Sequence, residues 1–160
     1  MSSTHLNKNK VNMSPQLAEQ VCYALYSTSG QITQAYVRLL SPHQLSYPQF
    51  VVMMGLWQQE GLSVTALARL VGLSKATLTP MLKRLEAQGY LERNRVSGDE
   101  RTMAITLSSK GLVFAQQAKL ITEQALCATG LTSEEAGQLI ALCNKVKTNL
   151  ANHAGQQETG

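Results

Sequence analysis

The sequence predicts a mainly helical fold of six helices with one small β-hairpin. Apolar residues recur at helical spacing over most of the chain, and capping residues, prolines and glycines divide this pattern into six segments. One further segment alternates as a pair of strands does. Because this hairpin follows two helices joined by a glycine-containing turn, the fold class is a winged helix-turn-helix.

The first helix is expected to begin after Ser14, with Pro15 at its first position, because a serine cap followed by proline is typical of a helix start. Apolar residues then recur at roughly helical spacing as far as Leu40, and Ser41-Pro42 ends the run. Residues 48–59 are apolar on most sides, which predicts a buried second helix.

The next two helices form the predicted helix-turn-helix. Ser63 can cap a short third helix over residues 63–70, and Gly72 supplies the turn after it. Ser74 can cap a fourth helix that runs to Gln88, where a following glycine ends it. Residues 90–96 and 101–107 then alternate around a polar, glycine-bearing tip, which predicts a hairpin in the position of a wing.

Two more helices complete the expected fold. The fifth begins near Ser108 and is broken near Gly130. The sixth begins at Thr132, where Glu135 three residues later forms a capping box, and it is expected to run to about Ala151.

The predicted domain organisation is one compact unit, residues 14–151, between two short tails. The long helices on both sides of the winged module carry more apolar faces than that module can cover, so we expect them to pack against a second subunit in a homodimer. The parts are a disordered tail 1–13, dimerisation helices 14–47, a winged module 48–107, dimerisation helices 108–151 and a disordered tail 152–160.

Composition narrows the possible functions. The polar start carries no signal-like apolar segment, and prolines and polar residues interrupt the uncharged stretch between Arg38 and Glu60. We therefore expect a cytoplasmic protein without a membrane span. Cys22, Cys127 and Cys143 lie far apart and lack the spacing of a zinc site or a thioredoxin-like motif, so neither a metal nor a cofactor is expected.

The basic residues are concentrated in one part of the chain. The net charge of +4 says little by itself, but seven of the 14 Lys and Arg residues fall between positions 69 and 101, against four acidic residues. A basic stripe on one pair of elements is what neutralisation of DNA phosphates requires.

The fourth helix is expected to enter the major groove of double-stranded DNA. Leu78, Leu82 and Leu85, with Met81, make a core face, and small hydroxyls and cations remain outside, where they suit base edges and phosphates. A solvated helix of a helical enzyme would explain this helix but not the wing after it. The expected contacts are Ser74, Lys75, Ala76, Thr77, Thr79, Lys83 and Arg84 on the helix, and Arg93, Arg95, Asp99 and Arg101 on the wing.

Over about residues 14–151, the order of these elements and the Asp99-Glu100-Arg101 segment of the wing resemble the multiple-antibiotic-resistance-regulator (MarR) family. Within that family, four segments resemble the organic hydroperoxide resistance regulators. They are Val-Cys-Tyr-Ala-Leu-Tyr at 21–26, Ala-Tyr at 35–36, Leu-Ser-Tyr-Pro-Gln-Phe at 45–50 and Leu-Thr-Pro-Met-Leu-Lys-Arg-Leu-Glu at 78–86.

The resemblance implies that Cys22 is a redox sensor. Hydrogen bonds from tyrosine hydroxyls to its sulfur would favour the reactive thiolate. Tyr26 lies one helical turn from Cys22, whereas Tyr36 and Tyr47 are too far along the chain to reach it within one straight helix. The resemblance therefore implies that the sensor sulfur is bonded by Tyr36 and Tyr47 of the partner subunit, although all three tyrosines could instead be ordinary buried aromatics.

The two-cysteine group of these regulators implies a resolving cysteine near the end of the fifth helix, where Cys127 stands; Cys143 is the alternative. The implied function is a homodimeric repressor that binds operator DNA when reduced. Organic hydroperoxide would oxidise Cys22 to a sulfenic acid, an intersubunit disulfide would follow, and the DNA would be released.

Two other functions are consistent with parts of the sequence. The chain could be a MarR-type repressor that a noncovalent aromatic ligand releases from DNA. It could also be a thiol peroxidase, but catalysis does not need a basic recognition helix and a wing, so we do not expect an enzyme.

Overall fold

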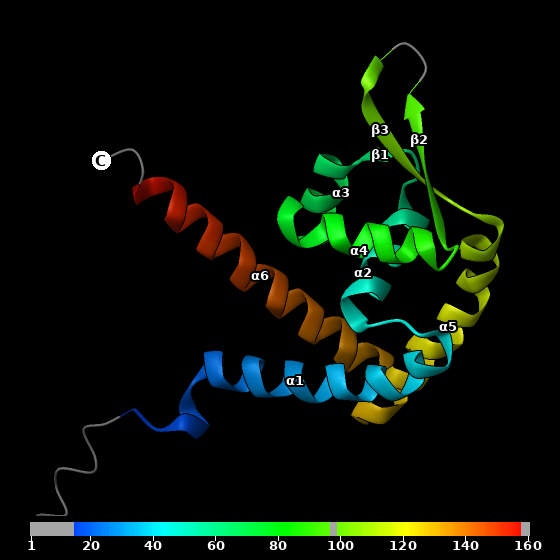
Figure 1. Cartoon of the computed structure of the whole chain (residues 1–160). Helices are drawn as coiled ribbons and strands as arrows, with labels where there is room; N and C mark the ends of the chain where they lie inside the picture. The colour runs from blue at the N-terminus through cyan, green and yellow to red at the C-terminus, as the bar shows by residue number, and fades with distance from the viewer. Residues whose placement is uncertain (1–14, 97–98, 158–160) are drawn as a thin grey trace, which may run out of the picture.

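The computed structural model describes the backbone of residues 15–96 and 99–157 and the side chains of residues 15–94 and 103–154. It is mainly helical with a three-stranded antiparallel sheet of order β1-β3-β2, which confirms the predicted fold class (Figure 1). The elements in chain order are η2 (Leu17–Glu19), α1 (Val21–Leu40), η3 (Ser41–His43), α2 (Tyr47–Gln58), β1 (Leu62–Ser63), α3 (Val64–Val71), α4 (Lys75–Ala87), β2 (Leu91–Val96), β3 (Asp99–Leu107), α5 (Ser109–Thr129) and α6 (Ser133–Gln157).

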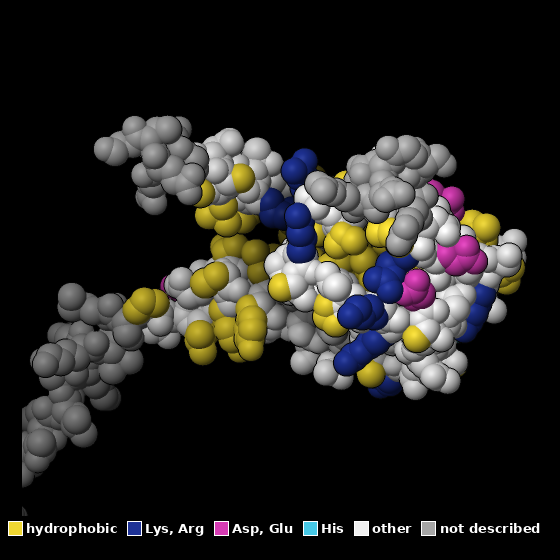
Figure 2. All heavy atoms as spheres, turned by 45° about the horizontal axis from the view of Figure 1, so that its top comes forward, with side chains coloured by type: hydrophobic (Ala, Val, Ile, Leu, Met, Phe, Trp, Pro, Cys, Tyr) yellow, Lys and Arg dark blue, Asp and Glu magenta, His cyan; other side chains and the backbone are white. Residues whose placement is uncertain are grey.

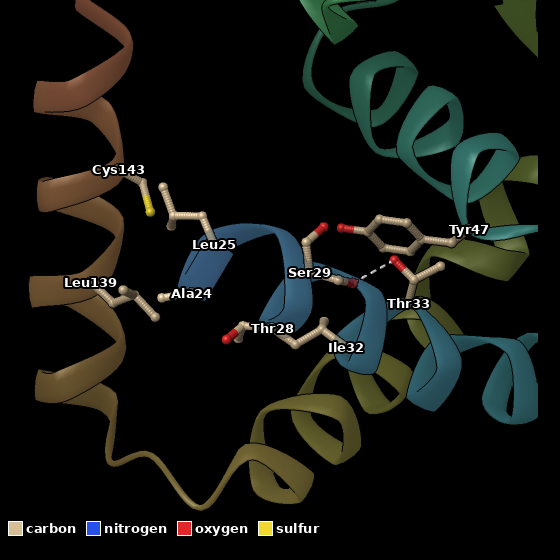
Figure 3. A pocket seen from close by; sticks show the side chains of 9 residues that line it. All are labelled: Ala24, Leu25, Thr28, Ser29, Ile32, Thr33, Tyr47, Leu139 and Cys143. Carbon is tan, nitrogen blue, oxygen red and sulfur yellow. Dashed lines mark hydrogen bonds between the residues drawn. The ribbon is translucent and has the colours of Figure 1, made fainter. Parts of the chain in front are cut away.

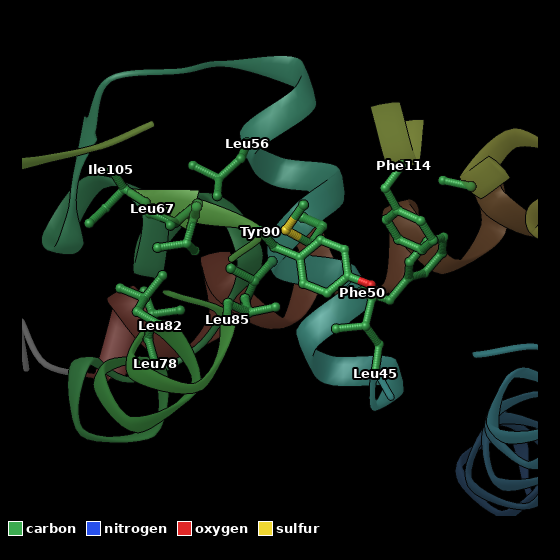
Figure 4. Packing of buried hydrophobic residues seen from close by; sticks show 14 of the residues in the cluster. Leu45, Phe50, Leu56, Leu67, Leu78, Leu82, Leu85, Tyr90, Ile105 and Phe114 are labelled. Atoms are coloured by element: carbon green, nitrogen blue, oxygen red, sulfur yellow. The ribbon is translucent and has the colours of Figure 1, made fainter. Parts of the chain in front are cut away.

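Most of the buried side chains lie in the winged module. Leu56 of α2, Leu67 of α3, Leu82 and Leu85 of α4 and Ile105 of β3 are fully or almost fully buried in one apolar cluster (Figure 4). Because helices and sheet share these contacts, α3, α4 and the hairpin are held in one compact body.

Local capping signals lie at the ends of α3, α4 and α5 as predicted. The side chains of Ser63, Ser74 and Ser108 accept hydrogen bonds from backbone N–H groups at the starts of α3, α4 and α5. Gly72 ends α3 and Gly130 ends α5, both in the left-handed conformation that glycine adopts without strain.

Strand β1 was not predicted. Leu62 pairs with Ile105 and Ser63 pairs with Ala104, so this two-residue strand adds an edge to the hairpin. Two residues are too few to show an alternating pattern, and their pairing depends on a strand about 40 residues later in the chain. Strand β3 also begins at Asp99, two residues earlier than expected.

The start of the first helix was predicted wrongly. Gln20 has an extended backbone, and it separates the short helix η2 from α1, which begins at Val21 rather than after Ser14. Leu17 and Val21 are 64% and 67% exposed, so no burial within this chain holds them on one continuous helix. Ser14 lies outside the described residues, as does the tail predicted for residues 1–13.

The sixth helix is longer than predicted. Thr132 and Glu135 form the expected capping box, with hydrogen bonds of 2.8 Å and 3.2 Å between their backbone N–H groups and side chains. The helix continues past Ala151 to Gln157, so the tail predicted for residues 152–160 is wrong for its first six residues. Residues 152–157 contain no proline, so every backbone N–H group of this stretch can donate a helical hydrogen bond.

Helices α1 and α6 extend from the body to the same side and diverge (Figure 1). They and α5 carry large apolar side chains that remain exposed, and Figure 2 shows such side chains along the extended arms. The exposed set includes Leu17 of η2 and, on the three long helices, Val21, Tyr23, Leu25, Tyr26, Val37, Leu112, Val113, Leu120, Leu139, Ile140, Leu142, Val146 and Leu150.

Hydrogen bonds and close packing join α5 to the winged module. The indole Nε1 of Trp57 donates to the backbone oxygen of Gly111 at 3.0 Å. Lys110 Nζ donates to the backbone oxygen of Gln88 at 2.7 Å and lies 4.2 Å from the ring centroid of Tyr90.

In the described part of the chain, no helix combines the length and the apolar character needed to cross a membrane.

Candidate DNA-binding and redox site

The start of α4 is shaped by its own hydroxyl groups. Ser74 Oγ accepts a hydrogen bond from the Thr77 backbone N–H at 3.1 Å and lies 2.7 Å from the Thr77 hydroxyl. The Thr79 hydroxyl donates to the Lys75 carbonyl at 2.7 Å, so its proton is used within the helix. Thr79 could therefore serve DNA as an acceptor from base edges more readily than as a donor.

The two faces of α4 separate as the sequence predicts. Leu78, Leu82 and Leu85 are buried, whereas all seven residues expected to contact DNA from this helix are exposed. Lys75 and Lys83 are eight residues apart and therefore lie on one stripe of the helix. Figure 2 shows Lys and Arg side chains gathered on this face of the compact body.

For most of the predicted wing contacts the structure describes the backbone but not the side chains. The backbone positions of Arg95 and Asp99 belong to the outer half of the hairpin, where Arg95 pairs with Met103 and Val96 with Asp99. The side chains of Arg95, Asp99 and Arg101 lie outside the described residues, so their DNA contacts stay predictions.

Arg93 has a partner that the sequence analysis did not anticipate. Its Nε donates to Glu86 Oε2 at 2.8 Å, and its terminal amino group contacts the same oxygen. The hydrogen bond to Glu86 is the main reason that the pKa of Arg93 is raised above its ordinary value. The seven-residue separation across a turn leaves no local sequence signal for this ion pair.

The three cysteines are free and occupy different helices. Cys22, the second residue of α1, is exposed, as is Cys127 near the end of α5. Cys143 is partly buried on α6. A thiol must be accessible to react with a peroxide in solution, and both predicted partners of the disulfide meet that requirement in the single chain.

Tyr36 and Tyr47 lie together, at the end of α1 and the start of α2. Their ring centroids are 4.6 Å apart, and Tyr36 also packs against Phe50 at 5.8 Å. Burial, and then the neighbouring Tyr47, raise the pKa of Tyr36. The Tyr36 phenol therefore keeps its proton near neutral pH and can act as a hydrogen-bond donor. Tyr26 is 79% exposed and does not lie within this ring contact.

A cavity of about 360 Å³ lies beside this tyrosine pair. Figure 3 shows that α1 lines one side with Ala24, Leu25 and Ile32, while Leu139 and Cys143 of α6 face it and Tyr47 closes one end. Sequence analysis missed this site; its one signal is the row of small residues at positions 24, 28 and 29 on α1.

In the described part of the chain, no cluster of three or more His, Cys, Asp or Glu side chains could hold a metal ion.

Comparison with known proteins decides the family. The model of the MarR family matches residues 45–103. The transcriptional regulator TtmR of Methylorubrum extorquens is 37% identical over 142 residues, which cover 89% of this chain and 73% of TtmR. This chain belongs to the MarR family. It is therefore a DNA-binding transcriptional regulator and not an enzyme, which excludes a thiol peroxidase.

The names of some similar proteins refer to organic hydroperoxide or to a reduced or disulfide state. The organic hydroperoxide resistance transcriptional regulator of Bacillus subtilis is 36% identical over 124 residues, covering 78% of this chain and 84% of the relative. The solved structure of reduced AbfR bound to DNA has a TM-score of 0.70 at 30% identity, covering 91% of this chain and 96% of that one. Disulfide-formed AbfR gives a TM-score of 0.63 at 27% identity, covering 91% and 97%.

Proposed function

We propose that this MarR-family chain is a homodimeric repressor of the two-cysteine organic hydroperoxide type. The observation that carries the proposal is the separation of the exposed Cys22 from the Tyr36–Tyr47 pair. Cys22 and Tyr36 are 14 residues apart on α1, roughly 21 Å along a helix. If the hydroxyl of Tyr36 or Tyr47 bonds the sensor sulfur, it must therefore come from the partner subunit, whereas Tyr26 lies one helical turn from Cys22 in the same chain.

Exposed apolar side chains support the dimer. Val21 and Tyr26 flank Cys22 on α1 and are 67% and 79% exposed, and α5 and α6 expose further large apolar residues. Isolated soluble chains rarely leave such extended apolar faces in water. We assign residues 14–47 and 108–151, with the rest of α6, to dimerisation, and residues 48–107 to the recognition of double-stranded operator DNA.

The proposed switch is an ordinary thiol oxidation. The Cys22 thiolate attacks the O–O bond of an organic hydroperoxide; its sulfur is oxidised to a sulfenic acid and the hydroperoxide is reduced to an alcohol. The Cys127 thiolate of the partner subunit then attacks the sulfenic sulfur, so that a disulfide forms and water leaves. Cellular thiols reduce the disulfide again by exchange.

Release of DNA follows from geometry. Two winged modules can occupy two half-sites together only at a fixed spacing. A disulfide between α1 and the α5 of the partner subunit brings two exposed cysteines to bond distance and so changes how the subunits pack. The reduced dimer binds and the oxidised dimer does not, with no loss of charge on α4.

The test is a gel-shift titration on duplex DNA from upstream of the protein's own gene, before and after treatment with cumene hydroperoxide. The wild-type protein should lose binding and regain it after dithiothreitol. Cys22→Ser should bind before and after treatment alike. Release of the Cys22→Ser protein by the hydroperoxide would refute Cys22 as the sensor.

The cavity between α1 and α6 favours one other function of the same class. Its lining is mainly apolar and its volume of about 360 Å³ suits a small aromatic molecule, which could release the repressor without oxidation. A variant with all three cysteines replaced by serine separates the two mechanisms, because a ligand would still release it from DNA whereas a hydroperoxide would not.

A further inference from the structure

One ion pair joins the recognition helix to the wing. Glu86 lies in the last turn of α4 and Arg93 is the third residue of β2, and two nitrogens of the Arg93 guanidinium contact the same Glu86 oxygen. Both side chains are about one third exposed, at 30% for Arg93 and 35% for Glu86. It is the one salt bridge found among the residues whose side chains the structure describes.

The turn between α4 and β2 makes this contact possible. Gly89 adopts a left-handed conformation, and the backbone N–H of Gly89 and Tyr90 donate to the carbonyls of Glu86 and Leu85 at 2.9 Å. The chain therefore reverses sharply, and β2 begins beside the end of α4.

Strand alternation then directs Arg93 toward the helix. Side chains two residues apart share a face of a strand, so Arg93 lies on the same face as the buried Leu91. Asn94 lies on the other face, where its amide donates to the Thr106 hydroxyl at 3.0 Å.

We infer that the Glu86–Arg93 pair sets the position of the wing relative to the recognition helix, and that Arg93 is a positioning residue rather than a phosphate ligand. The inference uses the DNA binding of the family and does not depend on the proposed redox switch. The hairpin continues roughly 10 Å beyond Arg93 to Val96. A small rotation at the turn consequently moves the far end of the wing across the DNA surface.

The two possible roles of Arg93 predict opposite effects of the Glu86→Gln substitution on DNA affinity. If Arg93 bound a phosphate, Glu86 would compete with the DNA, and Glu86→Gln would bind DNA as tightly as the wild type or more tightly. If the pair positions the wing, Glu86→Gln loses affinity although it removes a negative charge next to DNA. If Arg93 bound a phosphate, Arg93→Gln would also lower the salt dependence of DNA binding by about one ion.

The experiment measures the dissociation constant of a fluorescently labelled duplex by anisotropy at several salt concentrations. The duplex is one that the reduced wild-type protein binds in the gel-shift titration. Five variants are compared: Glu86→Gln, Arg93→Gln, the double variant with both changes, Arg93→Glu, and the charge-reversed pair Glu86→Arg with Arg93→Glu. Glu92→Gln is the matched control, because Glu92 carries the same charge on the opposite, exposed face of β2.

We expect each single variant to lose about three- to tenfold in affinity and the double variant to be no weaker than either, because the two side chains act as one unit. The charge-reversed pair should recover affinity relative to Arg93→Glu alone, and Glu92→Gln should not lose affinity. Melting temperatures verify that each variant is folded. Wild-type or tighter binding by Glu86→Gln, or additive losses in the double variant, overturn the inference.

Discussion

The rings of Tyr36 and Tyr47 are tilted by 38° with their centroids 4.6 Å apart, which places two phenols side by side at the junction of α1 and α2. This environment affects the protonation of Tyr36. An ionised Tyr36 would be partly shielded from water and would lie beside a second phenol, and both effects disfavour the charged form. Burial is the larger cause of its raised pKa and Tyr47 the smaller one.

The raised pKa predicts a loss of stability in alkaline solution. The unfolded chain loses the Tyr36 proton near the ordinary pKa of 10.0, while the folded chain still holds it, so the free energy of unfolding falls as the pH rises above that value. Urea titrations at about pH 9 and about pH 11 should show a smaller fall for Tyr36→Phe than for the wild type. A fall as large for Tyr36→Phe as for the wild type would contradict this prediction.

A methyl group at Gly111 should destabilise the junction between α5 and the winged module. A β-carbon there would overlap the backbone carbonyl oxygen of Tyr90 and press on Leu107, and backbone cannot move aside as a flexible side chain can. Gly111→Ala should lower the free energy of unfolding by about 1–3 kcal/mol or more.

The control for this change is Gly137→Ala, because nothing lies within 4 Å of a β-carbon at Gly137 on α6. It should be neutral or stabilise the helix by up to about 1 kcal/mol. Equal melting temperatures for the two variants would show that the close approach of Gly111 to Tyr90 does not limit stability.

The cysteine variants should differ on non-reducing gels after treatment with organic hydroperoxide. Cys127→Ser should abolish the reducible dimer band, because the proposed sulfenic acid on Cys22 would lack its resolving thiol. Cys143→Ser should keep the band, since Cys143 is partly buried against the α1 cavity. The opposite pattern would make Cys143 the resolving residue.

A single cation on the recognition helix should contribute to DNA binding at any sequence. Lys83 is exposed on the outer face of α4, so Lys83→Gln should weaken binding to specific and nonspecific duplexes alike and reduce the salt dependence by about one ion. Lys145→Gln, an exposed lysine on α6, removes the same charge away from the module and should leave both quantities unchanged. Anisotropy titrations at several salt concentrations measure them.

Local signals account for the parts of this structure that the sequence predicted. A serine that caps α3, α4 or α5 bonds a backbone group three residues later, and the core face of α4 repeats every three or four residues. Both effects act within a few residues and are readable without knowledge of the fold. The order of helices, the hairpin and the exposed face of α4 were predictable for this reason.

Tertiary structure decided what depends on distant segments. The strand β1 exists because Leu62 meets Ile105, and the Tyr36–Tyr47 contact requires the turn between α1 and α2. The sequence predicts Arg93 as a DNA contact, and only the packing of β2 beside α4 reveals Glu86 as its partner within the chain. The sequence by itself determined where α3, α4 and α5 begin and which residues carry charge. Only the packing of the helices determined which charges and hydroxyls meet, because such contacts are set by chain reversal and burial rather than by neighbouring residues.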